Sequence, residues 1–256
     1  MSTDEKFDRL TADQLKADLP DAVIGREIIV LQETSSTNDA ISRVASTDGM
    51  RCMPEGLVVF AEYQTGGRGQ RGNRWESAAG QGLWFSILLR PNIQLSDSGQ
   101  LTIWAIEATS DAIRAEFGLE PAIKLPNDIQ IYGRKISGVL VEMRAQDESP
   151  HLAVVGIGIN MNQRREDFPG DLQDRAISLS MALGHHVDRQ NFAAALLRKL
   201  DITYRQKFLH REVVAANVGR GSIGCATSEP RSTPTAMTSA APTTTRDTKE
   251  AKFRTA

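Results

Sequence analysis

A glycine- and arginine-rich segment follows an apolar, β-rich run of the chain. Residues 65–75 read Thr-Gly-Gly-Arg-Gly-Gln-Arg-Gly-Asn-Arg-Trp, with four glycines and three arginines. Glycines let backbone N–H groups approach a phosphate closely, and the planar guanidinium of arginine donates to phosphate oxygens. The segment therefore indicates a phosphate-binding loop, with a mobile hairpin loop that carries solvated arginines as the alternative.

The spacing of Gly67, Gly69 and Gly72 also satisfies G-x-G-x-x-G. In a dinucleotide-binding fold this pattern must open a helix. Here Trp75 is followed by further glycines that lead into another apolar β-rich run. The context therefore argues against a dinucleotide-binding fold.

A second cluster, Lys124-Leu125-Pro126-Asn127-Asp128, combines charges with a rigid turn. Pro126 disfavours the helical region for Leu125, which places Asn127 and Asp128 at a turn between two β-like runs. Asp128 could help to hold Mg²⁺ or orient a polar ligand, and Lys124 could neutralise an anion. A turn closed by an Asx hydrogen bond is the common alternative.

Three further segments carry polar groups next to apolar runs. Lys135 follows a turn signal at Gly133, and its ammonium could reach into a pocket or extend to solvent. Residues 156–162 read Gly-Ile-Gly-Ile-Asn-Met-Asn, and glycines within a β run mark close approach by a ligand or another backbone. Residues 35–39, Ser-Ser-Thr-Asn-Asp, could cap a helix or face a small ligand.

The composition excludes several classes of protein. With 256 residues, 40% of them hydrophobic, the chain can bury a core. Its longest apolar-plus-glycine run, residues 152–159, is far shorter than the ~20 residues that span a bilayer, and no signal-type apolar stretch opens the chain. Cys52 and Cys225 show no metal-ligand spacing, so we expect reduced thiols and a cytoplasmic protein.

The charge balance and the missing motifs narrow the function further. Residues 219–256 carry six Lys or Arg and three Asp or Glu, which leaves 24 basic and 29 acidic residues before them. This acidic balance makes a general nucleic-acid binder a poor interpretation, because such proteins need an excess of cations. The sequence contains no G-x-x-x-x-G-K-[ST], H-E-x-x-H or G-x-S-x-G, and its four histidines show no ligand spacing.

Short strands and three helices must position these residues. The β-rich runs are residues 27–31, 57–63, 83–89, 136–141 and 152–159. Helical spacing follows Ser36, recurs over 101–117 with Gly118 as its end, and recurs again over 192–208. Because several strands follow one another directly, the order favours an α+β domain with a mixed, largely antiparallel sheet.

The two ends of the chain differ from the part between them. Ten of the 20 residues 226–245 are Ser or Thr, so we expect 215–256 to be a low-complexity, disordered tail. Residues 1–26 are expected to be an N-terminal extension with at most a short helix. The domain is expected over 27–210.

Taken in order, these segments resemble the catalytic domain of biotin protein ligases, the biotin–[acetyl-CoA-carboxylase] ligases. The resemblance covers about residues 27–210, and its six motifs are specific in combination although none is so alone. They are Ser36-Thr37-Asn38, Ala61-Glu62-Tyr63-Gln64 with the loop that follows, Trp75, Lys124 to Asp128, Arg134 to Glu142, and Gly156 to Asn162.

The resemblance implies a fold shared with the cores of class II aminoacyl-tRNA synthetases and lipoate ligases. It also implies two half-reactions. Biotin and ATP form biotinyl-5′-AMP, and a lysine of a biotin carboxyl carrier protein then attacks this mixed anhydride. Mg²⁺ is expected to come with the ATP phosphates, near the turn of Asn127 and Asp128, and no protein metal site is assigned. The chain is expected to act as a monomer or homodimer.

The resemblance also implies roles for individual residues. The implied catalytic residues are Lys135, Arg68 and Asp128. Biotin binding is implied for Ser36, Thr37, Asn38, Gln64, Arg68, Gly69, Gln70, Lys135 and Gly138. ATP or adenylate binding is implied for Gly67, Gly69, Arg71, Trp75, Lys124, Asn127, Asp128 and Asn160.

The chain departs from the family pattern in three places. Gln70 stands where the family often has the second arginine of Gly-Arg-Gly-Arg, so the adenylate should be held less tightly unless Arg71 or Arg74 substitutes. Leu125 replaces a tryptophan and removes an aromatic wall. The small β-barrel that usually follows the last helix is not recognisable, and 25 residues leave no room for an N-terminal DNA-binding domain, so a repressor function is not expected.

Three alternatives stay open at this point. A lipoate–protein ligase would share the class and the fold but take a longer acyl substrate. A non-catalytic biotin-binding relative is compatible with Gln70 and the missing barrel. An adaptor that uses its tail and keeps the domain as scaffold is a third.

Overall fold

The structure is a computed structural model that describes residues 9–47, 55–145 and 151–209. All of them belong to one compact unit, Met1–Ala216. The expected tail, residues 215–256, lies outside the described residues, as do Cys52 and Cys225.

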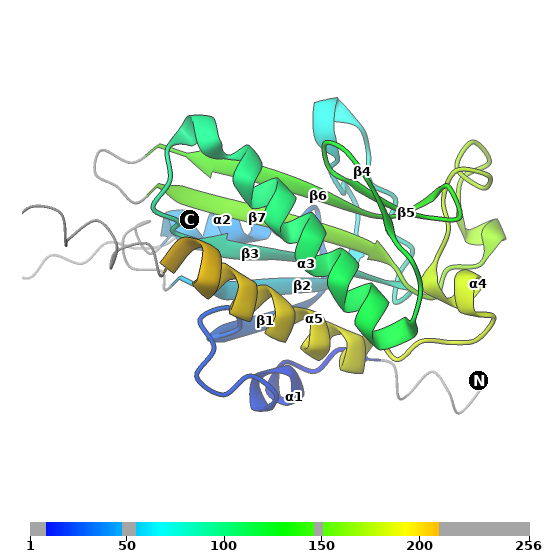
Figure 1. Ribbon diagram of the computed structural model, residues 1–256, viewed down its shortest axis with the longest axis horizontal. Coiled ribbons are helices and arrows are strands. Elements are labelled where there is room, and N and C mark those ends of the chain that lie inside the picture. The colour runs from blue at the N-terminus through cyan, green and yellow to red at the C-terminus, as the bar shows by residue number, and fades with distance from the viewer. Residues whose placement is uncertain (1–8, 48–54, 146–150, 210–256) are drawn as a thin grey trace, which may run out of the picture. The chain divides into compact units, whose positions relative to one another are not determined.

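The described residues are built around a seven-stranded sheet in the order β1-β2-β3-β7-β6-β5-β4 (Figure 1). The β1–β2 pair is parallel and the other neighbouring pairs are antiparallel. The strands are β1 Glu27–Thr34, β2 Leu57–Gln64, β3 Gly82–Leu89, β4 Ala122–Lys124, β5 Asp128–Ile131, β6 Arg134–Arg144 and β7 Leu152–Asn160. The predicted α+β class with a mixed, largely antiparallel sheet is confirmed.

Helices cover both faces of this sheet. The long helices α3 and α5 lie together on one face, and α2 lies on the other (Figure 1). The α-helices are α1 Ala12–Ala17, α2 Thr37–Thr47, α3 Gly99–Phe117, α4 Leu179–Leu183 and α5 Arg189–Tyr204, which continues as a π-turn over Arg205–Leu209. Short 3₁₀ turns occupy Gln70–Gly72, Leu95–Asp97 and Arg165–Asp167.

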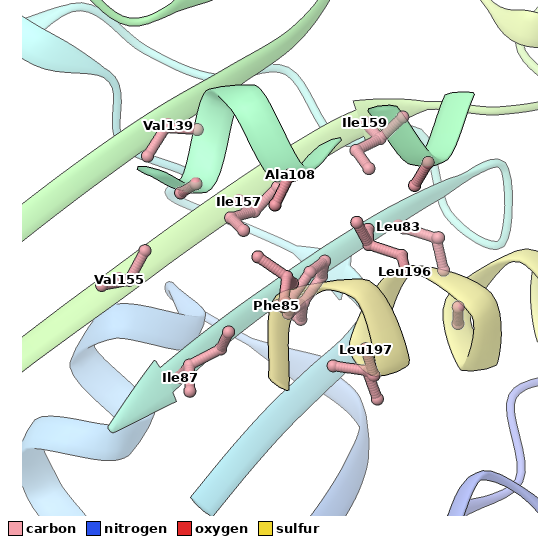
Figure 2. Close-up of a cluster of buried hydrophobic side chains, with 14 of the residues drawn as sticks. Leu83, Phe85, Ile87, Ala108, Val139, Val155, Ile157, Ile159, Leu196 and Leu197 are labelled. Carbon is pink, nitrogen blue, oxygen red and sulfur yellow. The ribbon is translucent and has the colours of Figure 1, made fainter. Parts of the chain in front are cut away.

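The main hydrophobic core fills the space between α3, α5 and the central strands. Figure 2 shows strand side chains such as Phe85, Val139 and Ile157 pointing toward Ala108 of α3 and Leu196 of α5. Alternate residues of a strand point to opposite faces, so the other face of the same strands is free to carry different side chains. A smaller apolar cluster lies there under α2.

Helix α3 begins two residues before the predicted stretch 101–117 and ends where its sequence predicts. Leu101, Trp104, Ala105 and Ala108 are buried, which matches the spacing of one helical face. Gly118 takes the left-handed conformation at φ 65°, and its N–H donates to the Arg114 carbonyl at 3.0 Å. This conformation favours glycine because it has no Cβ.

The N-terminal segment contributes to the same core as the sheet. Leu10, Leu15 and Leu19 are buried in the main core cluster. The Asp201 carboxylate of α5 accepts hydrogen bonds from the backbone N–H groups of Val23 and Ile24, at 2.7 and 2.9 Å. Residues 9–26 are therefore packed and hydrogen-bonded onto the domain that we predicted from residue 27.

Two polar pairs connect α5 to β2 and to the turn that precedes it. Arg189, which is 2% exposed, contacts the Glu62 carboxylate of β2 at 2.8 Å. Glu62 also accepts a hydrogen bond from the Leu10 N–H. Tyr204 donates to Glu55, and burial together with the Glu55 carboxylate raises the pKa of the Tyr204 hydroxyl far above its usual value. Tyr204 is therefore a neutral hydrogen-bond donor.

Candidate active site

On the sheet face that carries α2, three glycines of β6 and β7 leave one patch without side chains. Gly138 of β6 pairs with Gly158 of β7, and Gly156 pairs with Leu140 on one side and Ser86 on the other. Glycines within a strand leave room for another group to approach the backbone. Side chains from α2 and from the loop after β2 occupy this room.

Asn38, in the first turn of α2, covers Gly156. A Cβ atom at position 156 would lie 2.3 Å from Asn38 Oδ1. The Ser86 hydroxyl donates to Oδ1 at 2.5 Å, and Asn38 Nδ2 donates to the Glu142 carboxylate at 2.7 Å. The amide of Asn38 is therefore held at both ends, and the residue is only 3% exposed.

Gln64, at the end of β2, fixes the start of α2. Its Oε1 accepts a hydrogen bond from the Thr37 N–H at 2.9 Å, and its Nε2 donates to the Ser77 hydroxyl at 3.0 Å. The first N–H of the helix is thus satisfied by a side chain from a neighbouring strand. Ser36, Thr37 and Gln64 are all buried, so their polar groups are pre-positioned beside the glycine patch.

The indole of Trp75 lies over the paired glycines 138 and 158. Cβ atoms at these positions would lie 2.9 and 2.6 Å from the ring. The Lys135 ammonium is 5.2 Å from the ring centroid, within the range of a cation–π contact. The indole Nε1–H is buried and has no hydrogen-bond partner among the described residues. A buried unpaired donor costs ~1–3 kcal/mol, so an acceptor supplied by a ligand would be favourable there.

Lys135, whose ammonium contacts the Trp75 ring, comes from the start of β6. Its Nζ lies 2.6 Å from Asp128 Oδ1, and both side chains are partly buried. Asp128 begins β5 two residues after Pro126, and the Leu125–Pro126 peptide is cis. The hairpin of β4 and β5 therefore places the carboxylate, as the sequence placed it, at the turn after Pro126.

The glycine–arginine loop is folded back on itself. The Gly69 N–H donates to the Asn73 carbonyl at 2.7 Å, and the Trp75 N–H donates to the Gly67 carbonyl at 2.9 Å. Arg68 Nη2 lies 2.8 Å from both Asp39 of α2 and Glu142 of β6. The loop is therefore attached to α2 and to the sheet through Arg68.

Two cavities meet at Trp75 and Lys135, which line both of them. The first is narrow, about 40 Å³, and every residue to which the resemblance gives a biotin role lines it except Gln70. The second is larger, about 280 Å³. Among the residues with an implied nucleotide role it is lined by Trp75, Lys124, Asp128 and Asn160.

The remaining residues with implied roles lie elsewhere. Asn127 and Gly69 line the first cavity rather than the second. Gln70 and Arg71 form the short turn at the tip of the loop and, like Gly67, line neither cavity. Asn160 donates from Nδ2 to the Ile177 carbonyl at 3.1 Å, so part of its amide supports the backbone.

Sequence reasoning missed several residues that belong to these walls. Arg175 and Glu76 line the second cavity, which holds the cations Arg74, Lys124, Lys135 and Arg175 and the anions Glu76, Asp128 and Asp174. Each of these anions has a basic partner within 3.2 Å. Among the described residues, Lys124 and Arg175 have no ion-pair partner, which leaves positive charge for a ligand. Ser86 was also missed, although a single serine within the apolar run 83–89 was a signal.

Two features are absent from the described ranges. No group of three or more His, Cys, Asp or Glu side chains is arranged to hold a metal ion there. No helix in the described part of the chain has both the length and the apolar character needed to cross a bilayer.

Comparison with known proteins gives consistent results. The family model described as "Biotin/lipoate A/B protein ligase family" matches residues 30–160. A Bacillus subtilis protein named bifunctional ligase/repressor BirA is 37% identical over 206 residues, 80% of this chain. A Mycobacterium tuberculosis protein named biotin--[acetyl-CoA-carboxylase] ligase is 31% identical over 204 residues, 76% of this chain and 72% of that protein.

The fold agrees with these similarities. The structure of biotin protein ligase from Aquifex aeolicus in complex with biotin and ATP superposes with a TM-score of 0.60 and 30% identity, over 72% of this chain and 73% of that one. The chain spans 62% of the length of the two Bacillus BirA relatives that it matches. On the matched residues and this fold, the chain belongs to the biotin/lipoate A/B protein ligase family.

Proposed function

We propose that the chain is a biotin–protein ligase, which forms biotinyl-5′-AMP from biotin and ATP and transfers the biotinyl group to a lysine of a biotin carboxyl carrier protein. The observation that carries this proposal is the junction of the two cavities at Lys135 and Trp75. An adenylating enzyme must bring a carboxylate and the α-phosphate of ATP to one point, and two adjoining cavities with a shared cation provide such a point.

The first cavity suits the ring system of biotin. The ureido group of biotin has two N–H donors and one carbonyl acceptor, and the hydroxyls and amides of Ser36, Thr37, Asn38 and Gln64 offer both donors and acceptors. The glycines of β6 and β7 would leave room for the ureido ring beside the sheet once Trp75 moves with the loop. These four side chains are buried, so their hydrogen bonds to a ligand would form away from bulk water.

The first cavity must widen before biotin can enter. A single water needs roughly 10–15 Å³ by this kind of measure, so about 40 Å³ holds only a few waters. Arg68, Gly69 and Trp75, all from the glycine–arginine loop, form one side of it. We infer that this loop moves outward to admit biotin and closes again over the adenylate, which would exclude water from the mixed anhydride.

The second cavity suits ATP. It contains four basic and three acidic side chains, and Lys124 and Arg175 have charge to offer to phosphates. Mg²⁺ would arrive with the ATP phosphates as part of the substrate.

Lys135 would act on the reacting atoms themselves. A carboxylate oxygen of biotin attacks the α-phosphorus, a new O–P bond forms, and the bond to pyrophosphate breaks. Negative charge grows on the phosphoryl oxygens during this step, and a fixed ammonium beside them stabilises it. The lysine amine of the carrier then attacks the activated carbonyl and releases AMP.

Pyrophosphate release tests this proposal. The protein is incubated with ATP and either biotin or lipoate, and the pyrophosphate formed is measured. We expect release with biotin and little with lipoate. Release with lipoate alone would favour the lipoate–protein ligase. Binding of biotin without release from either acid would favour a non-catalytic biotin-binding relative.

A further inference from the structure

Glu142 of β6 joins two parts of the first cavity through one carboxylate oxygen. Its Oε2 accepts a hydrogen bond from Asn38 Nδ2 at 2.7 Å and lies 2.8 Å from Arg68 Nη2. Asn38 belongs to the wall beside the glycine patch, and Arg68 belongs to the side of the cavity that the glycine–arginine loop forms. Neither the motifs nor the cavity linings gave Glu142 a role.

The charge of Glu142 decides how the amide of Asn38 is oriented. A carboxylate only accepts hydrogen bonds, so it must face the NH₂ end of the amide. Ser86 donates to the other end at 2.5 Å, and the amide lies so close to Gly156 that a Cβ atom there would be 2.3 Å from Oδ1. One N–H and one lone pair of Asn38 remain for a ligand, in a fixed order.

The same carboxylate contributes to the position of the glycine–arginine loop. Arg68 contacts Glu142 and Asp39, and these contacts attach the loop to β6 and to α2. The side chains are 35–43% exposed, so each ion pair is a weak contact that ligand binding could replace. Asp39 shares the contact with Arg68, but the Asn38 amide donates to Glu142 and not to Asp39.

We propose that Glu142 is a positioning residue of this site, which orients the Asn38 amide toward the acyl substrate and holds the glycine–arginine loop through Arg68. The role in orienting Asn38 rests on the proposed function, because Asn38 is a proposed biotin ligand. The role in holding the loop concerns the ligand-free protein and is independent of the reaction.

Three variants and one control separate the effect of Glu142 on the Asn38 amide from its effect on the glycine–arginine loop. Glu142→Ala removes both contacts. Glu142→Gln keeps an oxygen that can accept from Asn38 but loses the charge that attracts Arg68. Asp39→Ala removes only a contact to Arg68. Glu120→Ala removes a remote surface pair with Arg114, which measures the general effect of losing an exposed carboxylate.

Hydrogen exchange of the Gly69 and Trp75 amides in the ligand-free protein measures the hold on the loop. We expect exchange about two- to fivefold faster in Glu142→Ala, Glu142→Gln and Asp39→Ala, because each loses an exposed ion pair. Exchange in Glu120→Ala and at amides of α3 should match wild type. Unchanged exchange at Gly69 and Trp75 in Glu142→Ala would overturn the role in the loop.

Biotin affinity measures the hold on Asn38. We expect the Kd for biotin to rise about tenfold in Glu142→Ala, because hydrogen bonds to charged groups contribute strongly. It should rise no more than about threefold in Glu142→Gln and Asp39→Ala, since the amide oxygen still accepts and Asp39 does not hold Asn38. If Glu142→Ala lowered the melting temperature but left the Kd for biotin at the wild-type value, Glu142 would stabilise the fold without orienting Asn38. If the wild type itself fails to bind biotin, the proposed function fails, and the exchange pattern still decides the hold on the loop.

Discussion

Lys135 and Asp128 form an ion pair of 2.6 Å at the junction of the two cavities. They come from neighbouring strands, with Asp128 at the start of β5 and Lys135 at the start of β6. The ammonium therefore has a partner before any ligand arrives, which offsets the cost of holding a partly buried charge. It also fixes the side chain beside Trp75, so no large rearrangement is needed to bring it to a reacting phosphate.

The glycine–arginine loop should be open to proteases when the site is empty. The ion pairs that attach Arg68 to α2 and β6 are partly exposed, so the local stability of the loop before Trp75 is low. Limited trypsin digestion with fragment analysis should show cleavage after Arg68, Arg71 or Arg74. Biotin with ATP should suppress that cleavage, because the adenylate gives the arginines an anion to bind. Equal cleavage at these sites with and without ligands would count against loop closure.

Adding a methyl group under Trp75 should disturb the junction without unfolding the sheet. In Gly158→Ala the new atom would lie 2.6 Å from the indole, so the ring must move. Overpacking of this kind costs ~1–3 kcal/mol. We expect adenylate formation to fall roughly ten- to a hundredfold, because small misplacements of reacting groups are costly.

Two matched variants control that experiment. Gly156→Ala places its methyl 2.3 Å from Asn38 Oδ1, so it should weaken biotin binding more than Gly158→Ala does. Gly170→Ala has no heavy atom within 4 Å of the new methyl and should behave as wild type. Wild-type binding and rates in both site variants would show that the glycines serve no ligand.

Removing Arg189 should destabilise the whole domain. Arg189→Met leaves the Glu62 carboxylate buried without the guanidinium that lies 2.8 Å away. Breaking a buried pair on one side typically costs ~3–5 kcal/mol. Urea unfolding followed by circular dichroism measures the loss. The double variant Glu62→Gln with Arg189→Met should recover part of it, because no buried charge is then left. A loss below ~1 kcal/mol in the single variant would show that the pair is not coupled to stability.

Much of the fold could be predicted because local patterns agree with the tertiary structure. The five apolar runs became β1, β2, β3, β6 and β7, and the three helical stripes became α2, α3 and α5. In each, periodic burial on one face is a property of a few neighbouring residues. The short strands β4 and β5 were visible only as the two β-like runs around the turn at Asn127 and Asp128.

Contacts between distant residues could not be predicted in the same way. The pair Arg189–Glu62 joins residues 127 positions apart, and nothing local in either segment announces it. The partners of Arg68 on α2 and β6 are of the same kind. These contacts depend on the order of the strands in the sheet, and the local patterns of a single sequence do not reveal that order.

The candidate site was recognised by motif order, whereas its geometry came from the structure. The glycines of residues 156–162 were expected to mark close approach by a ligand or a backbone. The groups that approach are the side chains of Asn38 and Trp75. The surroundings of Arg71 also differ from what its residue type suggested. Its charge suggested a phosphate contact, and the structure places it at the exposed tip of the loop.

Single-turnover adenylate formation in wild type, Lys135→Ala and Lys124→Ala shows whether Lys135 acts where biotin and ATP react. Lys135 lies where both cavities meet, and Lys124 lines only the second. Losing one preorganised charge partner of a transition state typically costs ~3–4 kcal/mol, a rate loss of roughly a hundred- to a thousandfold. We predict that loss for Lys135→Ala, with a smaller change in biotin Kd, and a smaller loss of rate for Lys124→Ala. A near-wild-type rate for Lys135→Ala would remove Lys135 from the reacting site and contradict the account.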